Sequence, residues 1–150
     1  MNLVYFTKAI VDRITADTSF PTSNVSTYFG DANNTPRVVI EVSAEADDTF
    51  TQDGITMTVR FHVFDLREAG FAAACAGIID RLRGDAAAQA NRVPTYGFHR
   101  HNLTLTQAVS GMQWAAGLCR YVRSDTSHDE SMYHFIETYE VRQTASTTES

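Results

Sequence analysis

The stretch from residue 55 to residue 64 alternates apolar and polar side chains, and it constrains the fold more than any other part of the chain. Its apolar positions are Ile55, Met57, Val59, Phe61 and Val63. A two-residue period is typical of a β-strand that buries one face and exposes the other. The chain therefore needs a sheet that is covered on one side, and we predict a strand over residues 55–64.

A helix is predicted immediately after this strand. Apolar residues recur there at spacings of three and four, namely Phe71, Ala74, Cys75, Ile78 and Leu82. Asp65 stands three residues before Glu68, so we expect this pair to cap the first turn as a variant of the capping box. Gly84 is expected to end the helix, because glycine readily adopts the left-handed conformation common at helix C-termini.

Similar patterns predict one further helix and five further strands. The helix is expected at 2–16, and the strands at 25–29, 37–43, 98–109, 114–123 and 131–142. The strand at 37–43 should pair with the strand at 55–64, and Leu118 and Val122 should share one face of their strand. These elements predict the α+β class, with a mostly antiparallel or mixed sheet packed against two helices in the order α-β-β-β-α-β-β-β.

The composition indicates one domain. The 150 residues are 43% hydrophobic and 11% aromatic, which is enough to fill a single core. We assign residues 1–142 to this domain and expect the Thr/Ser-rich segment 143–150 to be disordered. Cys75 and Cys119 lack any motif spacing and are expected to be buried free thiols. No apolar run approaches the ~20 residues of a spanning helix, so we expect no membrane contact and a cytoplasmic location.

The segment between the two predicted paired strands, residues 44–54, is acidic and turn-rich. It contains Glu45, Asp47, Asp48 and Asp53 around a single aromatic residue, Phe50. We expect a connection too long for a tight hairpin, and long connections in compact domains are often functional. Two interpretations stay open: Phe50 contacts a partner, or the loop is solvated and Phe50 folds back on its own sheet.

The charge balance argues against general nucleic-acid binding. The chain carries 18 acidic and 12 basic residues, a formal net charge of −6. Long-range electrostatics therefore oppose approach to a phosphate backbone. Arg120 and Arg123 on one predicted strand, with Arg100 on another, are interpreted as partners in ion pairs within the sheet or between subunits.

The histidines do not form a recognisable metal motif. His99 and His101 lie two residues apart, which can bring two imidazoles to one ion, but no third ligand stands at a defined spacing. His62, His128 and His134 are interpreted as surface residues or ion-pair partners. We therefore expect no metal and no cofactor.

No catalytic motif is found either. Asp47, Asp48 and Asp53 lack the order and the closing glutamate of a calcium loop. The chain has no nucleophile elbow and no phosphate-binding glycine loop. We expect a protein that is not an enzyme and has no catalytic residues.

The order of elements resembles a known family. A helix, a strand bearing RVVIEV, an acidic segment ending in DG, a strand ITMTVRFHVFD and a helix AGFAAACAGIIDRLRG are similar to the tail-terminator, or tail-completion, proteins of long-tailed bacteriophages. The resemblance covers residues 3–84 clearly and the last third in outline. The connector before Phe98 and the Thr/Ser-rich tail depart from the pattern.

The resemblance implies a structural virion protein. Such a subunit forms a ring, expected to be hexameric, that caps the head-proximal end of the tail tube, stops its polymerisation and joins it to the neck or connector. The implied partners are other copies of the chain, the tail-tube protein and a neck or connector protein, with DNA passing through the lumen without specific binding. Assembly would take place in the cytoplasm of the host bacterium.

Closed rings use two different faces of each subunit, which must be complementary. The residues expected to supply opposing charges and contacts at the subunit or tube interface are Asp47, Asp48, Phe50, Arg60, Arg120 and Arg123. Two alternatives remain open: another virion component of similar build, such as a tail-tube or head-to-tail joining protein, and a small-ligand-binding or enzymatic α+β domain.

Overall fold

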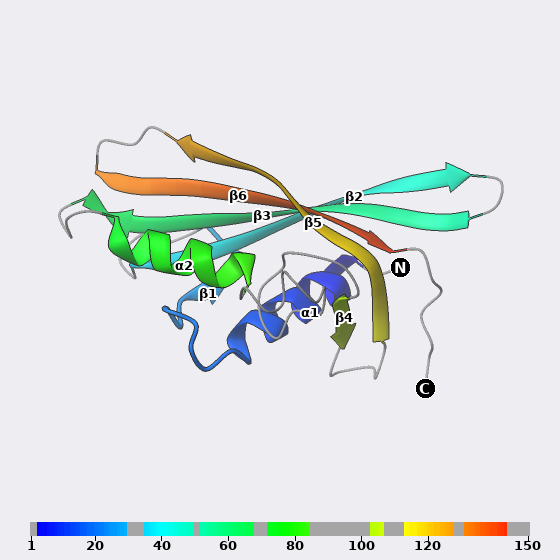
Figure 1. The fold of residues 1–150 in the computed structure, drawn as a ribbon, viewed down its shortest axis with the longest axis horizontal. Coiled ribbons are helices and arrows are strands. Elements are labelled where there is room, and N and C mark those ends of the chain that lie inside the picture. The colour runs from blue at the N-terminus through cyan, green and yellow to red at the C-terminus, as the bar shows by residue number, and fades with distance from the viewer. Residues whose placement is uncertain are drawn as a thin grey trace.

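A computed structural model of the chain describes residues 3–29, 35–49, 52–67, 72–84, 103–106, 113–127 and 131–143. The helices are α1 (Leu3–Thr15) and α2 (Ala73–Arg83). The strands are β1 (Val25–Ser26), β2 (Arg37–Thr49), β3 (Gln52–Leu66), β4 (Leu103–Thr106), β5 (Gln113–Ser127) and β6 (Met132–Gln143). The predicted α+β class is confirmed, and the elements follow one another in outline as expected (Figure 1).

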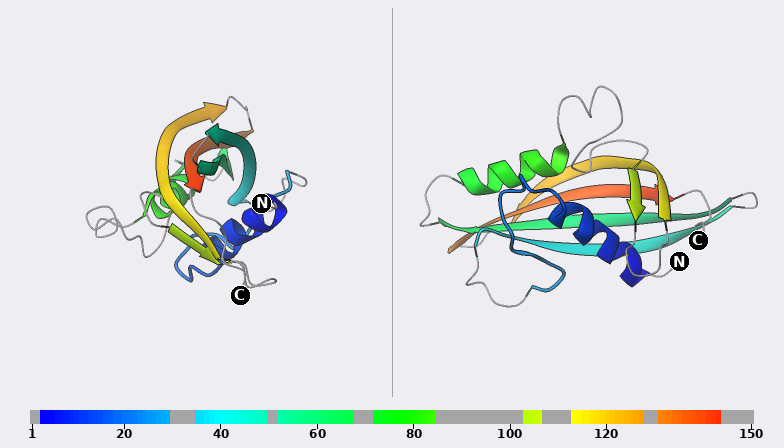
Figure 2. Two further views of the ribbon diagram at one scale, coloured as in Figure 1. Left: turned by 90° about the vertical axis from the view of Figure 1, so that its right-hand side faces the viewer. Right: turned by 90° about the horizontal axis from the view of Figure 1, so that it is seen from below.

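The strands form one six-stranded sheet in the order β1-β2-β3-β6-β5-β4. β1 runs parallel to β2, and every other neighbouring pair is antiparallel. The sheet is strongly twisted, as antiparallel ribbons of this length are, and both helices lie on the same side of it (Figure 2). We call the side that faces the helices the inner face and the opposite side the outer face.

The core fills the space between the inner face and the helices. Fully buried apolar side chains come from both helices and from three neighbouring strands, namely Phe6, Ile10, Ile14, Ile40, Met57, Val59, Phe61, Val63, Cys75, Ile78, Leu82, Tyr139 and Val141. The predicted alternation at residues 55–64 is confirmed, because its odd-numbered positions from Met57 to Val63 are all buried. The rings of Phe61 and Tyr139 meet edge to face on adjacent strands, with centroids 5.6 Å apart.

The start of α2 differs from the prediction. Asp65 does not cap this helix but lies within β3, where it pairs in register with Tyr133 of β6. Its carboxylate accepts a hydrogen bond from the N–H of Leu66 at 2.8 Å. The ladder to β6 holds the backbone extended past Asp65, so the helix begins at Ala73. Gly84 does end α2, with φ of 87°, as predicted.

The connection between β2 and β3 also differs from the prediction. The two strands pair continuously from Arg37↔Phe64 to Thr49↔Gln52, which leaves only residues 50 and 51 between them. The acidic stretch is therefore mostly strand and not a long loop. Acidic residues are poor strand formers on average, but pairing along the whole hairpin outweighs that local preference.

Val122 does not share a buried face with its neighbours as expected. The register of β5 against β6 shifts between Tyr121 and Arg123, which places one extra residue in β5. Such a bulge reverses the inward and outward alternation beyond it. Tyr121 thus packs against the core, while Val122 is exposed.

An ion pair fixes the end of α2 to the chain that leaves α1. The guanidinium of Arg81 donates to both carboxylate oxygens of Asp17, at 2.5 and 2.6 Å, and Asp17 also accepts from the N–H of Ser19 at 3.0 Å. Both side chains are mostly shielded from solvent. The hydrogen bonds from Arg81 lower the pKa of Asp17 below its usual value of 3.8.

We predict that Asp17→Asn lowers the free energy of unfolding by about 1–3 kcal/mol at pH 7, because a shielded charge loses its partner. A lowered folded-state pKa gives stability that is complete above pH 3.8 and is lost as the pH falls through the folded-state pKa. The gap between wild type and variant should therefore shrink in urea unfolding below pH 4. Asp12→Asn, which breaks only the exposed pair with Lys8, is the control and should change stability little. A gap that persists unchanged at pH 2.5 would contradict this role.

Candidate interaction surfaces

The outer face of the sheet carries charged side chains in rows that cross the strands. One row joins Glu41 of β2, Arg60 of β3, Thr138 of β6 and Arg123 of β5, which are successive register partners. The next row toward the β2–β3 hairpin includes Glu140, opposite Arg120. The structure thus brings the three arginines predicted for an interface onto one face, although they come from two strands far apart in sequence.

Each of these arginines already has a carboxylate partner in its own chain. Arg60 lies 3.4 Å from Glu41, Arg120 lies 3.3 Å from Glu140, and Arg123 lies 2.9 Å from Asp125. These side chains are between 34% and 63% exposed. Exposed pairs of this kind contribute at most about 1 kcal/mol, so they can exchange partners at little cost.

The far end of the β2–β3 hairpin projects beyond the rest of the sheet (Figure 1). β6 pairs with β3 only as far as Ile55↔Gln143, so residues 47–49 and 52–54 form a two-stranded extension among the described strands. We call this extension the arm. Asp47 stands opposite Gly54, and Asp48 stands opposite Asp53. The predicted contact residue Phe50 lies outside the described residues.

The edge of β2 is open along most of its length within the described part of the chain. β1 pairs only with Val38 and Val39. The N–H of Val38 donates to the carbonyl of Asn24 at 2.9 Å, which shows that this amide points toward the edge. Amides alternate in direction along a strand, so those of every second residue from Ile40 onward point to the same edge. A row of such groups can pair with a strand of another chain.

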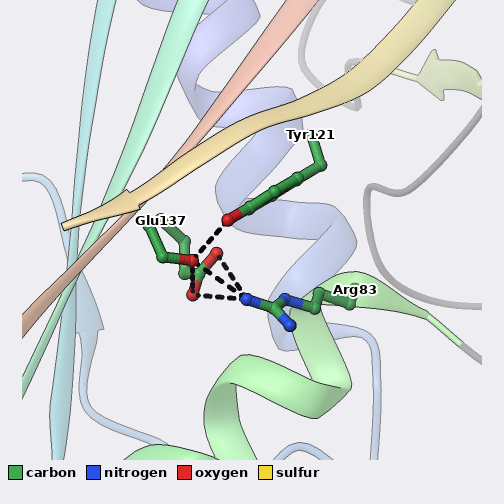
Figure 3. Close-up of polar contacts among 4 residues, drawn as sticks. Arg83, Tyr121 and Glu137 are labelled. Carbon is green, nitrogen blue, oxygen red and sulfur yellow. Dashed lines mark hydrogen bonds and ion pairs between the residues drawn. The ribbon is translucent and has the colours of Figure 1, made fainter.

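A buried carboxylate holds the end of α2 on the inner face (Figure 3). Glu137 of β6 is 1% exposed and accepts hydrogen bonds from the guanidinium of Arg83 at 3.1 Å and from the hydroxyl of Ser124 at 2.7 Å. The hydroxyl of Tyr121 lies 2.6 Å from that of Ser124, and the Arg83 guanidinium lies over the Tyr121 ring at 5.0 Å.

These contacts neutralise the buried charge. Burial alone lowers the pKa of Arg83, but the charge of Glu137 outweighs burial, and the net result is a raised pKa. The sequence pattern missed this residue, although a signal was present: Glu137 occupies an inward position among Tyr133, Phe135, Tyr139 and Val141. The cluster joins α2 to β5 and β6.

Two histidines meet at the end of the outer face opposite the arm. The Nδ1 atom of His62 lies 3.0 Å from the Nε2 atom of His134. The other nitrogen of His62 lies 3.6 Å from a carboxylate oxygen of Glu41. The ring of Phe29 meets His62 edge-on at 4.9 Å, and Phe64 stacks on His134 at 4.2 Å.

The interpretation of His62 as a surface residue was wrong, because this residue is 8% exposed. Its contact with Glu41 does match the alternative of an ion-pair partner. Burial lowers the pKa of His62 and so favours the neutral ring at pH 7. Among the described residues, no group of three or more His, Cys, Asp or Glu side chains is arranged to hold a metal ion. His99, His101 and His128 lie outside those residues.

Cys75 is a buried free thiol, as predicted. Burial raises the pKa of this thiol to about 11, which keeps it in the unreactive protonated form. The side chain of Cys119 lies outside the described part of the structure. Neither α1 nor α2 is long and apolar enough to cross a membrane.

Comparison with known proteins supplies one likeness. No protein-family model and no curated protein matches the sequence. A chain in a solved structure of the virion of a native gene transfer agent (GTA) particle superimposes with a TM-score of 0.63 at 16% sequence identity. The superposition covers 93% of this chain and 94% of that chain, so the two share a fold over nearly their whole length.

We predict that Arg83→Met lowers the free energy of unfolding by about 3 kcal/mol, because it leaves the buried carboxylate of Glu137 without its counter-charge. The double variant Arg83→Met/Glu137→Gln should be more stable than the single variant, since it no longer buries an unpaired charge. Urea unfolding of the complete double-mutant cycle measures this coupling. Arg123→Met, which removes an exposed arginine, is the matched control and should cost less than about 1 kcal/mol. Strictly additive effects would show that the contact contributes nothing.

Proposed function

We propose that this chain is a structural virion protein that assembles into a closed ring, hexameric in number, at the head-proximal end of a phage tail tube. The ring stops tube polymerisation and joins the tube to the neck or connector. The chain acts as a scaffold and an interface, and it has no catalytic role. DNA passes through the lumen, and the net charge of −6 disfavours its retention there.

The projecting arm is the observation that carries this proposal. A two-stranded ribbon with no sheet or helix to pack on is marginally stable by itself. Asp48 and Asp53 stand directly opposite each other on this ribbon, and like charges at opposed positions destabilise a strand pair. A basic surface of a neighbouring copy would relieve both problems at once.

The outer face supplies such a surface. Arg60, Arg120 and Arg123 lie there in weak, exposed ion pairs that can be exchanged. An arm on one part of the subunit and its receptor on another make a heterologous interface, which closes into a ring when the rotation between subunits permits. Asp47, Asp48 and Phe50 belong to one side of this interface, and the three arginines belong to the other.

The comparison supports a virion setting. The chain of similar fold is part of a virion, and the likeness extends over 94% of that chain. It therefore matches a whole subunit and not a fragment. The same observation suits a tail-tube or head-to-tail joining protein, and the assembly state distinguishes these possibilities, since a tube protein polymerises without limit.

Charge reversal in the arm tests the proposed interface. Asp47→Lys/Asp48→Lys should prevent ring closure while far-UV circular dichroism and the melting temperature stay near wild type, because the arm lies outside the core. Negative-stain microscopy of the purified protein, alone and with tail tubes, is the measurement. Asp12→Lys/Asp80→Lys makes the same charge change on the helices and should leave the rings intact.

The outcomes separate the alternatives. Normal rings from the arm variant would remove the arm from the interface. Wild-type protein that forms open tubes would indicate a tube protein. Wild-type protein that remains monomeric and leaves tubes uncapped would overturn the ring altogether.

A proline scan of β2 tests whether the open edge takes part. The amide of Ala44 points to the edge and that of Ser43 points to β3, by alternation from Val38. Proline removes the amide hydrogen, so Ala44→Pro should spare the monomer and impair ring formation. Ser43→Pro should instead destabilise the monomer itself, because it breaks the ladder to β3. Rings of normal abundance from Ala44→Pro would exclude pairing at this edge.

A further inference from the structure

We propose that His62 and His134 form a two-histidine site on the outer face for a first-row transition-metal ion such as Zn²⁺, with water completing the coordination. The two residues come from adjacent strands, β3 and β6, and lie on the same face. His62 is in register with Ile136, so His134 is its diagonal neighbour two residues along β6. The site is independent of the proposed ring function.

The separation of the two rings suits a shared ion. The facing nitrogen atoms lie 3.0 Å apart, and the ring centroids lie 5.2 Å apart. Two imidazole nitrogens on a tetrahedral zinc ion, at the usual bond length, are separated by roughly 3.3 Å. The rings therefore need to part by only a few tenths of an ångström, which rotation about the side-chain torsions can supply.

Glu41 stands where a second layer of the site would place a carboxylate. A histidine that binds a metal through one nitrogen usually donates its other N–H to a carboxylate, and this contact fixes the tautomer. Glu41 lies 3.6 Å from the far nitrogen of His62. With the His62 proton on that far nitrogen, the lone pair of Nδ1 faces His134, as a ligand must.

The protons balance without an added base. In the absence of an ion, the Nε2–H of His134 donates to the Nδ1 atom of His62 across the 3.0 Å contact. On binding, the His134 proton moves to the other nitrogen of that ring, so that both facing lone pairs coordinate the ion. Two neutral imidazoles bind one hydrated ion, and one or more of its waters are displaced.

The surroundings favour neutral rings but limit the affinity. Burial under Phe29 lowers the pKa of His62, so this ring is ready to bind at pH 7. The charges nearby are Glu41, which attracts a cation, and Arg60 and Arg37, which repel one. Arg60 is neutralised in part by Glu41 at 3.4 Å. A weak site with open coordination positions follows from this balance.

Zinc titration calorimetry at pH 7.5 tests the site in a full-length background that keeps only these two histidines, His99→Gln/His101→Gln/His128→Gln. One zinc ion per chain should bind. Adding His134→Gln should weaken binding at least tenfold. Adding Glu41→Gln should weaken it by about tenfold, as loss of an outer carboxylate does, without loss of folding. Arg60→Gln should tighten it.

A second measurement keeps the proposal testable if His134→Gln lowers stability through its lost stacking on Phe64. In ¹⁵N NMR of the background variant, zinc should shift the resonances of His62 Nδ1 and His134 Nε2 strongly and their other ring nitrogens less. Unchanged ring resonances, or equal zinc affinity with and without His134, would overturn the site.

Discussion

The pairing of β3 on both of its edges is the constraint on which the rest of the structure depends. This strand is in register with β2 over its whole length and with β6 from Ile55 to Leu66. Because every inward position from Met57 to Val63 is fully buried, a slip of one residue would move these side chains to the other face and expose them. The register therefore fixes the positions of β2 and β6, and both helices then cover the same inner face.

The two faces of the sheet follow from this arrangement and have different chemistry. The inner face is apolar except where Glu137 meets Arg83, and that pair joins the last turn of α2 to β6. A buried ion pair is a costly way to hold a helix, since the desolvation of two charges offsets much of their attraction. What it supplies is a specific position, because the guanidinium must reach one carboxylate.

The outer face combines exposed ion pairs with a sheltered histidine pair. Its arginines are held by single carboxylates and remain exposed, as expected of side chains that can meet another surface. At the opposite end from the arm, Phe29 and Phe64 enclose His62 and His134 in a more apolar setting. One surface thus presents a charged region suited to assembly and a separate region suited to binding an ion.

The sequence by itself determined the class of the fold and most of its elements. The alternation at residues 55–64 and the spacing of apolar residues in both helices depend on local periodicity, which is visible along the chain. Gly84 was predictable for the same reason, since its conformation is a local property of a helix end.

Only the tertiary structure decided the features that depend on partners distant in sequence. Pairing with β6 extends β3 past Asp65 and cancels the predicted cap, and pairing with β3 turns the acidic stretch into an arm. A bulge in β5 sends Val122 outward and Tyr121 inward. The contacts of Glu137 with Arg83, and of His62 with His134, join residues that are 54 and 72 positions apart. No local pattern encodes such distances, because they are set by strand order and register.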